Sequence, residues 1–350
     1  MPPRERVPKA YHQVHALAFS PLLFNAAMAA RNMGVLHAVQ KAKRAGITPA
    51  DVATQAAVSL YAARVLLEGC LALELVAFDG TLYRLTDAGH LWLTDRMTQV
   101  NANFVQDICY AGAAHLEESL RTGTPAGLKV FGEWSTIYEG LTQLPEHAQK
   151  SWFEFDHFYS DQAFPHAFPR VFDAKPARLL DVGGNTGKWA LFCLTRDPAV
   201  EITVLDHPGQ LGKLQQNAVA AGVANRLRTR PIDLLDHSLA FPTGFDVVWM
   251  SQFLDCFSED DIVKLLERGR AALAPTGRLH ILESYWDRQP NEVGELCVQG
   301  TSLYFSCMAN GTSRMYHSQD FIDLIPKAGL RIELDQAIGS AHTMFTCVPA

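Results

Sequence analysis

The stretch Arg178-Leu179-Leu180-Asp181-Val182 runs directly into Gly183-Gly184-Asn185-Thr186-Gly187. Its first half is a short, mostly apolar run that glycines follow, which is typical of a buried strand. The glycines allow positive φ angles and let a ligand approach the backbone at a strand-to-helix turn. The turn lacks both the third glycine of the dinucleotide fingerprint and the lysine–hydroxyl pair of a phosphate-binding loop. The stretch therefore predicts a ligand-binding turn of an α/β fold outside those two classes.

Strand-like runs and helical segments alternate from residue 177 onward. Such alternation predicts a doubly wound, mostly parallel sheet. The runs at 330–334 and 343–348 are expected to close the sheet as an antiparallel pair. The other expected strands are 178–182, 201–205, 227–232, 245–250 and 277–282, and the expected helices lie near 187–196, 208–221 and 259–274.

Three acidic residues stand at the ends of successive expected strands. Asp181, before the glycines, is placed to hold the turn or to meet a ligand's ammonium group. Asp206, about twenty residues beyond the glycines, is placed to accept both hydroxyls of a ribose. Asp233 is placed to accept from an adenine amino group. The structural alternatives are a helix cap for Asp206 and a solvated turn for Asp233. Together with the glycine turn, the three acids predict an S-adenosylmethionine site.

The first half of the chain predicts a small, mostly helical domain. Thr48 and Ser59 are expected caps of two consecutive helices, and Asp79-Gly80 is a strong turn signal between two β-like runs. Helices followed by a hairpin are typical of a winged helix, which raises DNA binding as a rival function. From residue 48 to residue 95 the only lysines or arginines are Arg64 and Arg84, against six acidic residues. Such a surface cannot neutralise several phosphates, so packing and dimerisation are favoured.

An apolar stretch at 14–30 follows several basic residues, an outline shared with secretory signal peptides. Polar residues and a proline interrupt it, and its pattern continues into another expected helix at 28–45. A helix that packs against a partner subunit is therefore favoured. No stretch reaches about 18 uninterrupted apolar residues, so no membrane span is expected. The basic residues are Arg4, Arg6 and Lys9, and the interruptions are His15, Ser20, Pro21 and Asn25.

Length and composition limit the remaining possibilities. A chain of 350 residues is long for one domain and comfortable for two. We expect a helical winged-helix dimerisation domain at 1–100, a helical linker and substrate-pocket region at 101–175, and a Rossmann-like domain at 176–350. The net charge of -7 gives no general attraction to nucleic acid or anionic lipid. The seven cysteines are widely spaced, which indicates a cytoplasmic protein without structural zinc.

The chain resembles the two-domain O-methyltransferases typified by plant caffeic-acid and bacterial hydroxyneurosporene enzymes. The motifs that carry the resemblance are 181–187, Asp206-His207-Pro208, Ile232-Asp233-Leu234 and Ala328-Gly329-Leu330. It covers nearly the whole chain and implies a homodimer that binds S-adenosylmethionine. The residues assigned to the cofactor are Asp181, Gly183, Gly184, Gly187, Asp206, Asp233, Leu234 and Ser251.

The catalytic positions depart from the family pattern. The family usually carries Leu-His-Asp-Trp after the fourth strand, whereas this chain has Leu254-Asp255-Cys256-Phe257, so that Asp255 takes the place of the histidine base. The family's next acid is preserved as Glu283. A further glutamate is replaced by Ser313, although Arg314 remains. We therefore predict Asp255, Glu283 and Arg314 as the catalytic group, without a metal ion.

An ordinary aspartate, with a pKa near 3.9, is a weak base toward a phenol. Burial beside Glu283 is expected to raise the pKa of Asp255, because two carboxylates sharing a site resist double ionisation. The structural alternative for Asp255 is a residue that orders the loop before the next helix. His157 and His317 are alternative bases. The expected substrate pocket contains His157, Phe158, Tyr304 and Met308, with Asn310 nearby.

The predicted function is methyl transfer from S-adenosylmethionine to a small aromatic, phenolic acceptor, free or tethered to a carrier, with O-methylation favoured. Because the usual histidine is absent, C-methylation of a phenol ring is a second possibility. Bacterial pigment pathways use methyltransferases on aryl head groups of this kind. A third possibility is a non-catalytic regulator that binds the cofactor without turnover. Nucleic acid and membrane are not expected partners.

Overall fold

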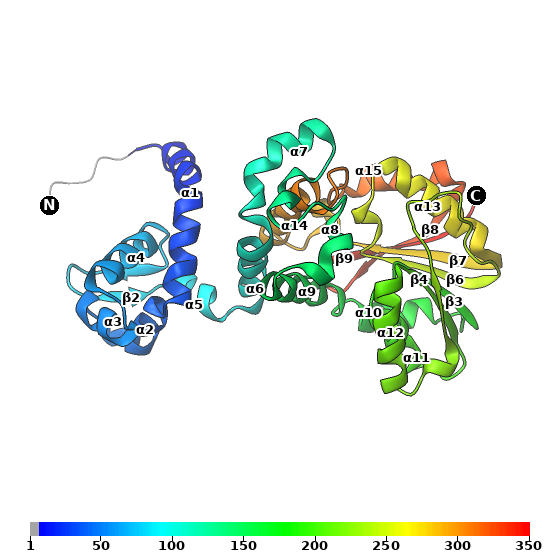
Figure 1. The fold of residues 1–350 in the computed structure, drawn as a ribbon, viewed down its shortest axis with the longest axis horizontal. Coiled ribbons are helices and arrows are strands. Elements are labelled where there is room, and N and C mark those ends of the chain that lie inside the picture. The colour runs from blue at the N-terminus through cyan, green and yellow to red at the C-terminus, as the bar shows by residue number, and fades with distance from the viewer. Residues whose placement is uncertain (1–6) are drawn as a thin grey trace. The chain divides into compact units, whose positions relative to one another are not determined.

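The computed structural model describes residues 7–350 and divides the chain into two compact units, the first ending at Asn103 and the second beginning at Phe104. Two of the basic residues that precede the apolar stretch at 14–30, Arg4 and Arg6, lie outside the described residues. Residues 104–175 belong to the same unit as the sheet, whereas the sequence suggested a separate linker region. Figure 1 shows both units, and each is described by itself below.

The first unit has the predicted succession of capped helices and a hairpin. Thr48 accepts a hydrogen bond from the Asp51 N–H, and Ser59 accepts one from the Ala62 N–H, so both predicted caps are confirmed. Asp79 Oδ1 accepts from the backbone N–H groups of Thr81 and Leu82 and so stabilises the hairpin turn. The elements are α1 (Lys9–Asn32), α2 (Val35–Ala42), η1 (Lys43–Ala45), α3 (Pro49–Ala56), α4 (Leu60–Ala72), β1 (Val76–Phe78), β2 (Tyr83–Leu85), α5 (Asp87–Thr94) and α6 (Arg96–Phe104).

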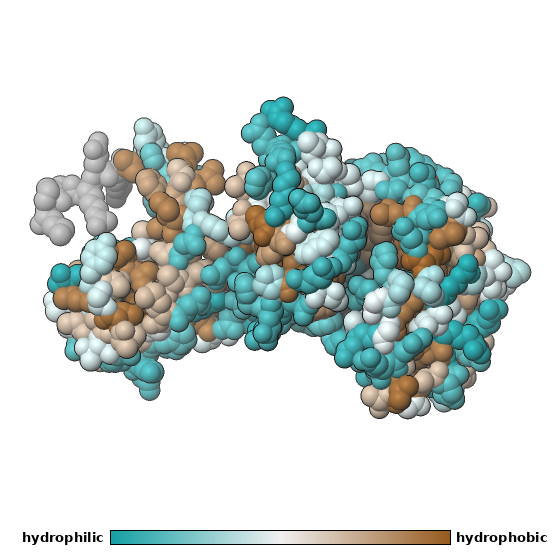
Figure 2. Space-filling model, viewed as in Figure 1, coloured by the Kyte–Doolittle hydropathy of each residue, from teal (hydrophilic) through white to brown (hydrophobic). Residues whose placement is uncertain are grey.

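Helix α1 leaves many apolar side chains outside the core of this unit. Leu17 is 72% exposed and Leu22 is 69% exposed, and Val14 and Phe19 are exposed as well. Figure 2 shows these apolar atoms gathered on the surface of the helix. No helix within residues 7–350 is long and apolar enough to cross a membrane.

The second unit is built on a seven-stranded sheet of order β5-β4-β3-β6-β7-β9-β8. The strands from β3 to β7 pair in parallel, and β9 pairs antiparallel with both β7 and β8. The predicted doubly wound sheet with an antiparallel closing pair is confirmed. The strands are β3 (Arg178–Val182), β4 (Glu201–Asp206), β5 (Leu227–Pro231), β6 (Phe245–Ser251), β7 (Leu273–Glu283), β8 (Leu330–Ile338) and β9 (His342–Pro349).

Helices cover both faces of this sheet (Figure 1). One face packs against side chains of α10 (Phe164–Val171), α11 (Lys188–Leu194) and α12 (Pro208–Ala220). The other face packs against α13 (Glu259–Ala272) and α15 (Ser318–Ile322). Because the chain leaves β3 toward β4 on one side and continues through β6 on the other, the strand order reverses between β3 and β6. Ligands of open α/β sheets bind beyond the carboxyl ends of the strands at such a point.

A helical layer completes the unit and has its own apolar core, which includes Phe104, Ile108, Trp152 and Tyr304. Two short π-helical turns, η2 and η9, interrupt it, and such turns are frequent at functional sites. The remaining elements are η2 (Val105–Cys109), η3 (Gly112–His115), α7 (Leu116–Thr122), η4 (Ala126–Val130), α8 (Ile137–Gly140), η5 (Leu141–Gln143), α9 (Glu146–Ser160), η6 (Ala224–Arg226), η7 (Leu254–Cys256), η8 (Trp286–Arg288), α14 (Glu292–Tyr304), η9 (Phe305–Ala309) and η10 (Pro326–Ala328).

Candidate active site

A cleft lies at the point where the strand order reverses. Its walls come from the turn after β3, from the end of β6, and from α9, α10 and the start of α11. It encloses about 500 Å³ of empty space, part of it open to solvent. Its lining residues are Asp156, His157, Ser160, Phe164, Asp181, Gly183, Gly184, Asn185, Thr186, Lys188, Trp189, Trp249, Ser251 and Gln252.

The glycine turn has the backbone that the sequence predicts. Gly183 has φ 73° and Gly187 has φ 86°, both in the left-handed region where a side chain is disfavoured. A Cβ atom at Gly187 would lie 1.9 Å from Leu214 Cδ1, and one at Gly183 would lie 2.3 Å from Phe253 Cδ2. Both glycines are therefore required by close packing as well as by conformation.

Asp181 is a predicted cofactor residue whose buried carboxyl group lines the cleft. Its side chain is buried at the end of β3, and its Oδ2 atom has no hydrogen-bond partner among residues 7–350. Burial, together with the nearby Asp206 carboxylate, raises the pKa of Asp181 to about 8. A buried carboxyl group of this kind needs a hydrogen-bond partner, and an ammonium group would favour its ionised form.

Asp206 is predicted to bind the ligand, and it also has a structural role. Its Oδ2 accepts a 2.8 Å hydrogen bond from the Asn185 N–H, and its Oδ1 accepts from the His207 N–H at 2.6 Å. It therefore stabilises the glycine turn from the end of β4. Burial raises the pKa of Asp206, and these two hydrogen bonds oppose the shift. Each carboxylate oxygen retains a further lone pair for a ligand hydroxyl.

Asp233 and Leu234 do not reach the lining of the cleft. Asp233 is exposed, and its Oδ1 accepts from the Leu235 N–H at 2.9 Å, which matches the solvated-turn alternative. Leu234 is buried, and its carbonyl accepts a 2.7 Å hydrogen bond from Arg268 Nη1. Contacts of these two residues with the cofactor remain predictions.

Asp255 lies in η7 after β6, and Glu283 is the last residue of the neighbouring strand β7. Both are buried, and neither is among the residues that line the cleft. Glu283 Oε1 accepts hydrogen bonds from the backbone N–H groups of Phe253 at 3.1 Å and Leu254 at 2.9 Å. Burial raises the pKa of Asp255 to about 6. Burial, and secondarily the Asp255 carboxylate, raises the pKa of Glu283 well above its usual value. The Asp255 carboxylate thus acts on the ionisation of Glu283, whereas the rise in the pKa of Asp255 itself comes from burial.

His157 lines the cleft from α9, and its neighbour Asp156 lines it too. Burial lowers the pKa of His157, so the ring is neutral near pH 7. Burial raises the pKa of Asp156 to about 7, and the Asp161 and Asp255 carboxylates add to this shift. Phe158 is not part of the cleft lining; its ring packs edge-on against Tyr159 at 5.1 Å.

Tyr304 and Met308 belong to the helical core instead of the cleft. Trp152 Nε1 donates a 2.8 Å hydrogen bond to the Tyr304 hydroxyl, and burial raises the pKa of this tyrosine well above its usual value. Met308 is fully buried, and its sulfur fills the space beside Gly112 and Gly127. This position fits an ordinary core methionine, the alternative to the predicted role of Met308 in the pocket.

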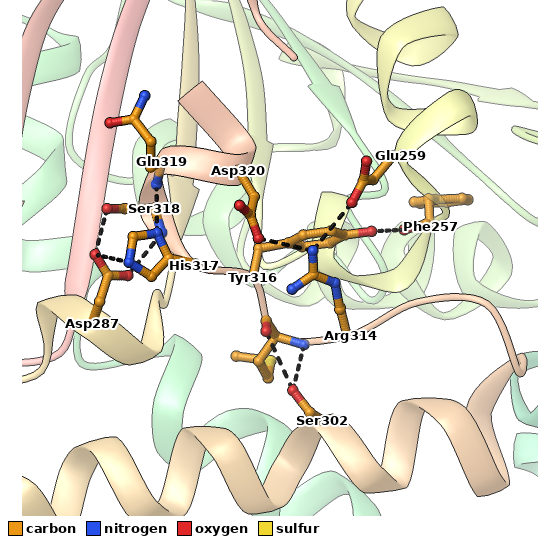
Figure 3. A network of polar contacts seen from close by, with 11 residues as sticks. Phe257, Glu259, Asp287, Ser302, Arg314, Tyr316, His317, Ser318, Gln319 and Asp320 are labelled. Atoms are coloured by element: carbon orange, nitrogen blue, oxygen red, sulfur yellow. Dashed lines mark hydrogen bonds and ion pairs between the residues drawn. The ribbon is translucent and has the colours of Figure 1, made fainter. Parts of the chain in front are cut away.

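Arg314 is held on the surface by acidic side chains (Figure 3). Its Nη2 atom lies 3.1 Å from Glu259 Oε1 and 2.9 Å from Asp320 Oδ2, and its guanidinium lies over the ring of Tyr316. Tyr316 in turn donates a 2.7 Å hydrogen bond to the Phe257 carbonyl. Arg314 therefore orders the segment that follows η9, and it does not reach the cleft.

His317 is likewise a structural residue in this network (Figure 3). It caps α15 by accepting a 3.0 Å hydrogen bond from the Gln319 N–H at Nδ1. Its Nε2 lies 3.6 Å from Asp287, which also accepts hydrogen bonds from the Ser318 N–H and hydroxyl. Asn310 donates to the Cys256 carbonyl and so joins the segment after η9 to the loop that carries Asp255.

Several cleft residues had no sequence signal of their own. Gln252 follows β6 with φ 46°, and Trp189 stacks on Trp249 with ring centroids 4.2 Å apart. Gln252 Nε2 and both indole Nε1 atoms are buried without a hydrogen-bond partner in the described part of the chain. Tryptophans on a helix and a buried strand are ordinary core residues by pattern. Only their position in the lining of the cleft identifies the indole N–H groups as candidate donors to a ligand.

Comparison with known proteins agrees with this geometry. The model of the O-methyltransferase domain matches residues 170–331, and that of the Dimerisation2-like domain matches residues 12–83. The chain is a methyltransferase with an O-methyltransferase domain. The methyltransferase is 24% identical to L-tyrosine C(3)-methyltransferase of Streptomyces lavendulae, over 96% of this chain and 91% of that protein. It is 26% identical to 3-amino-4-hydroxybenzoate 4-O-methyltransferase of Streptomyces cremeus, over 73% and 67% respectively.

The crystal structure of the S-adenosylmethionine-dependent methyltransferase SibL in its apo form has the same fold. It superposes with a TM-score of 0.71 at 24% identity, over 97% of this chain and 99% of that chain. The methyltransferase therefore has the two-domain fold expected from the sequence and uses S-adenosylmethionine as its cofactor. The O-methyltransferase domain and the methyltransferase relatives favour the predicted enzyme over the non-catalytic regulator.

The residues of the cleft fit this cofactor. The unpaired Asp181 Oδ2 complements an ammonium group, and the spare lone pairs of Asp206 complement hydroxyl groups. Gly183 and Gly184, which follow Asp181 in the cleft lining, present backbone without side chains. These acceptors match the ammonium group and the ribose hydroxyls of S-adenosylmethionine.

Proposed function

We propose that this methyltransferase transfers the methyl group to the hydroxyl oxygen of a small phenolic acceptor. The observation that carries the proposal is the pair of buried carboxyl groups of Asp255, in the loop that begins at the cleft residue Gln252, and Glu283, at the end of β7. A carboxyl group whose pKa lies near 6 is ionised at neutral pH and is a stronger base than an ordinary aspartate. Both of the relatives named above act on phenols by their names.

Cofactor binding rests on the residues of the cleft. In this proposal Asp181 accepts from the cofactor's ammonium group, and Asp206 accepts from its ribose hydroxyls. Gly183, Gly184, Gly187 and Ser251 bring backbone and a small side chain close to it. When bound, the cofactor supplies a methyl group on a positively charged sulfur, ready for in-line attack.

The chain's own contribution to the reaction is orientation and proton removal. Asp255 accepts the proton of the acceptor hydroxyl, so that the oxygen becomes a better nucleophile. Glu283 positions Asp255 by accepting from the two N–H groups that precede it. Holding the oxygen at the methyl carbon supplies much of the rate enhancement, because orientation converts an encounter into an intramolecular step.

Aromatic side chains of the helical layer favour a flat acceptor. Phe104 and Phe155 stack with centroids 4.0 Å apart, and Phe153 stacks on the cleft residue His157 at 5.9 Å. Aromatic walls are typical of pockets for planar ligands. Whether the acceptor is free or tethered to a carrier is left open by this proposal.

Methylation of a ring carbon is the second candidate. The relative that matches 96% of this chain is named as a C-methyltransferase acting on tyrosine. A phenol activated by Asp255 is nucleophilic at its ring carbons as well as at oxygen. After methylation at carbon, Asp255 would return the proton to the oxygen and accept the ring proton, so that one proton is lost overall. The proposal favours oxygen because O-methylation needs only the first of these proton transfers.

We further propose that the methyltransferase is a cytoplasmic homodimer. Residues 12–83 match a dimerisation domain, and α1 leaves Val14, Leu17, Phe19 and Leu22 exposed. Burial of such an apolar helix face against a second copy is favourable.

Product analysis tests the reaction. The protein is incubated with methyl-labelled S-adenosylmethionine and a panel of phenols that includes L-tyrosine and 3-amino-4-hydroxybenzoate, and the products are assigned by NMR. The proposal expects the label in a methyl ether. Label on a ring carbon would support the second candidate, and absence of transfer to every phenol would contradict both.

A further inference from the structure

Gln252 has an unusual backbone at the edge of the cleft. It stands between β6 and η7 with φ 46°, in the left-handed region that residues with a side chain rarely adopt. Its N–H donates a 2.8 Å hydrogen bond to the Leu282 carbonyl, which fixes it to the end of β7. Residues held in this way cluster at active sites and ligand clamps. The conformation turns the chain out of the strand at the point where it enters the catalytic loop.

The side chain of Gln252 ends in a donor without an acceptor. Its Nε2 atom is buried and has no hydrogen-bond partner within residues 7–350, although the residue lines the cleft. A buried amide group without a partner is costly, and nearly all such groups in native proteins are paired. The geometry therefore calls for a ligand atom that accepts a hydrogen bond.

Gln252 begins the loop that carries Asp255. The Gln252 N–H is bonded to the Leu282 carbonyl, and the N–H groups of Phe253 and Leu254 are bonded to Oε1 of Glu283, the next residue of β7. The amide of Gln252 and the carboxyl group of Asp255 therefore belong to one ordered loop of four residues, and the amide supplies the unpaired donor.

The chemistry of these atoms selects the functional group of the acceptor. A hydroxyl group accepts from an amide N–H and at the same time donates to a carboxyl oxygen. An ammonium group can only donate and a carboxylate can only accept, so neither pairs with both atoms. After the proton has left, the oxygen is negatively charged and its hydrogen bond from an amide is stronger.

We propose that the Gln252 amide donates a hydrogen bond to the hydroxyl oxygen of the acceptor and holds that oxygen for deprotonation by Asp255. This inference rests on the proposed function and narrows the substrate class to hydroxylated aromatics. It holds for transfer to oxygen and to ring carbon alike, because both begin with ionisation of the hydroxyl. Gln252 is then a positioning residue that stabilises the phenolate.

Binding of a coloured phenol tests this without turnover. The full-length protein is saturated with S-adenosylhomocysteine, and para-nitrophenol is titrated across pH, with phenolate absorbance as the readout. Gln252→Leu is expected to weaken phenolate binding about tenfold or more, since a hydrogen bond to a charged group is lost. The pH at which the bound phenol ionises should rise, while S-adenosylhomocysteine affinity should stay within about twofold.

Two further variants sharpen the result. Gln252→Glu, with a carboxylate of similar shape, is expected to weaken phenolate binding at least as much as Gln252→Leu. Gln215→Leu removes an amide on α12 that donates to Thr229 of the edge strand β5, outside the cleft lining, and it should change neither affinity. Thermal melts establish that each variant is folded.

The assignment is overturned if wild type and Gln252→Leu bind the phenolate equally. It is also overturned if Gln252→Leu weakens S-adenosylhomocysteine binding and leaves phenolate binding unchanged, because Gln252 would then hold the cofactor. A wild-type protein that binds phenolates through Gln252 but transfers no methyl group would contradict the proposed function and leave the hydrogen bond intact.

Discussion

The backbone N–H of Leu254 donates a 2.9 Å hydrogen bond to Oε1 of Glu283. This contact, with the parallel one from Phe253, ties the loop after β6 to the end of β7. Asp255 follows immediately, so its carboxyl group is positioned by a buried acid on the neighbouring strand. Glu283 therefore has a role in building the site that is separate from any contact with the acceptor.

Removing this acceptor should destabilise the protein. Glu283→Ala leaves two buried N–H groups without partners, and we expect a loss of about 2–5 kcal/mol in the free energy of unfolding. Glu283→Gln keeps an oxygen that can accept both hydrogen bonds and should cost less than about 1.5 kcal/mol. Urea denaturation measures both. Equal losses for the two variants would show that the loop does not depend on this oxygen.

Cofactor binding should release a proton near pH 7. Asp181 has a pKa of about 8 in the free protein, so it is mostly protonated at pH 7. An ammonium partner favours the ionised form, and affinity should therefore rise with pH, by up to about tenfold per unit below pH 8. Calorimetry in buffers of different ionisation enthalpy measures the proton. Asp181→Asn should bind more weakly and without this pH dependence; an unchanged pH dependence would exclude Asp181 as its source.

The glycine turn should not tolerate a side chain at Gly187. Gly187→Ala would place a Cβ 1.9 Å from Leu214 Cδ1 at a φ of 86°. We expect a loss of about 1–3 kcal/mol in stability from the backbone conformation alone, together with weaker cofactor binding. Gly212→Ala is the matched control in helix α12, because nothing lies within 4 Å of its Cβ position. It should stabilise the helix by about 0.5–1 kcal/mol. Thermal melts and cofactor titrations compare the two.

The exposed face of α1 should mediate self-association. Leu17→Glu replaces an apolar side chain that is 72% exposed, so it should fold normally and yet weaken the dimer by about 2 kcal/mol or more. Val219→Glu, on α12 and 70% exposed, is the control and should leave the dimer intact. Light scattering over a dilution series gives the masses. A Leu17→Glu protein that remains as dimeric as wild type would contradict this interface.

Local patterns were sufficient for most of the fold. The caps Thr48 and Ser59, the Asp79-Gly80 turn and the strand around Asp181 are short-range features, and each is confirmed. The parallel order of strands also follows from alternation of strands and helices. The sequence suggested a separate region at 101–175, because helical periodicity does not show which neighbouring core a helix joins.

The site could be predicted only in part. Glycines and acids at strand ends mark the cleft because topology brings strand ends together. The direction of a side chain such as Arg314, which pairs with Glu259 and Asp320, depends on tertiary partners that the sequence does not show. The donors of Gln252 and the two cleft tryptophans were missed for the same reason.

The most direct test of the account is the pH dependence of methyl transfer with Asp255 and with Asp255→Asn. Burial raises the pKa of Asp255 to about 6, so kcat/KM of the wild type should fall about tenfold per unit below pH 6 and level off above it. Asp255→Asn should be slower by about a hundredfold or more and should lose this dependence on pH. An Asp255→Asn enzyme with the wild-type rate and profile would contradict the assignment of Asp255 as the base.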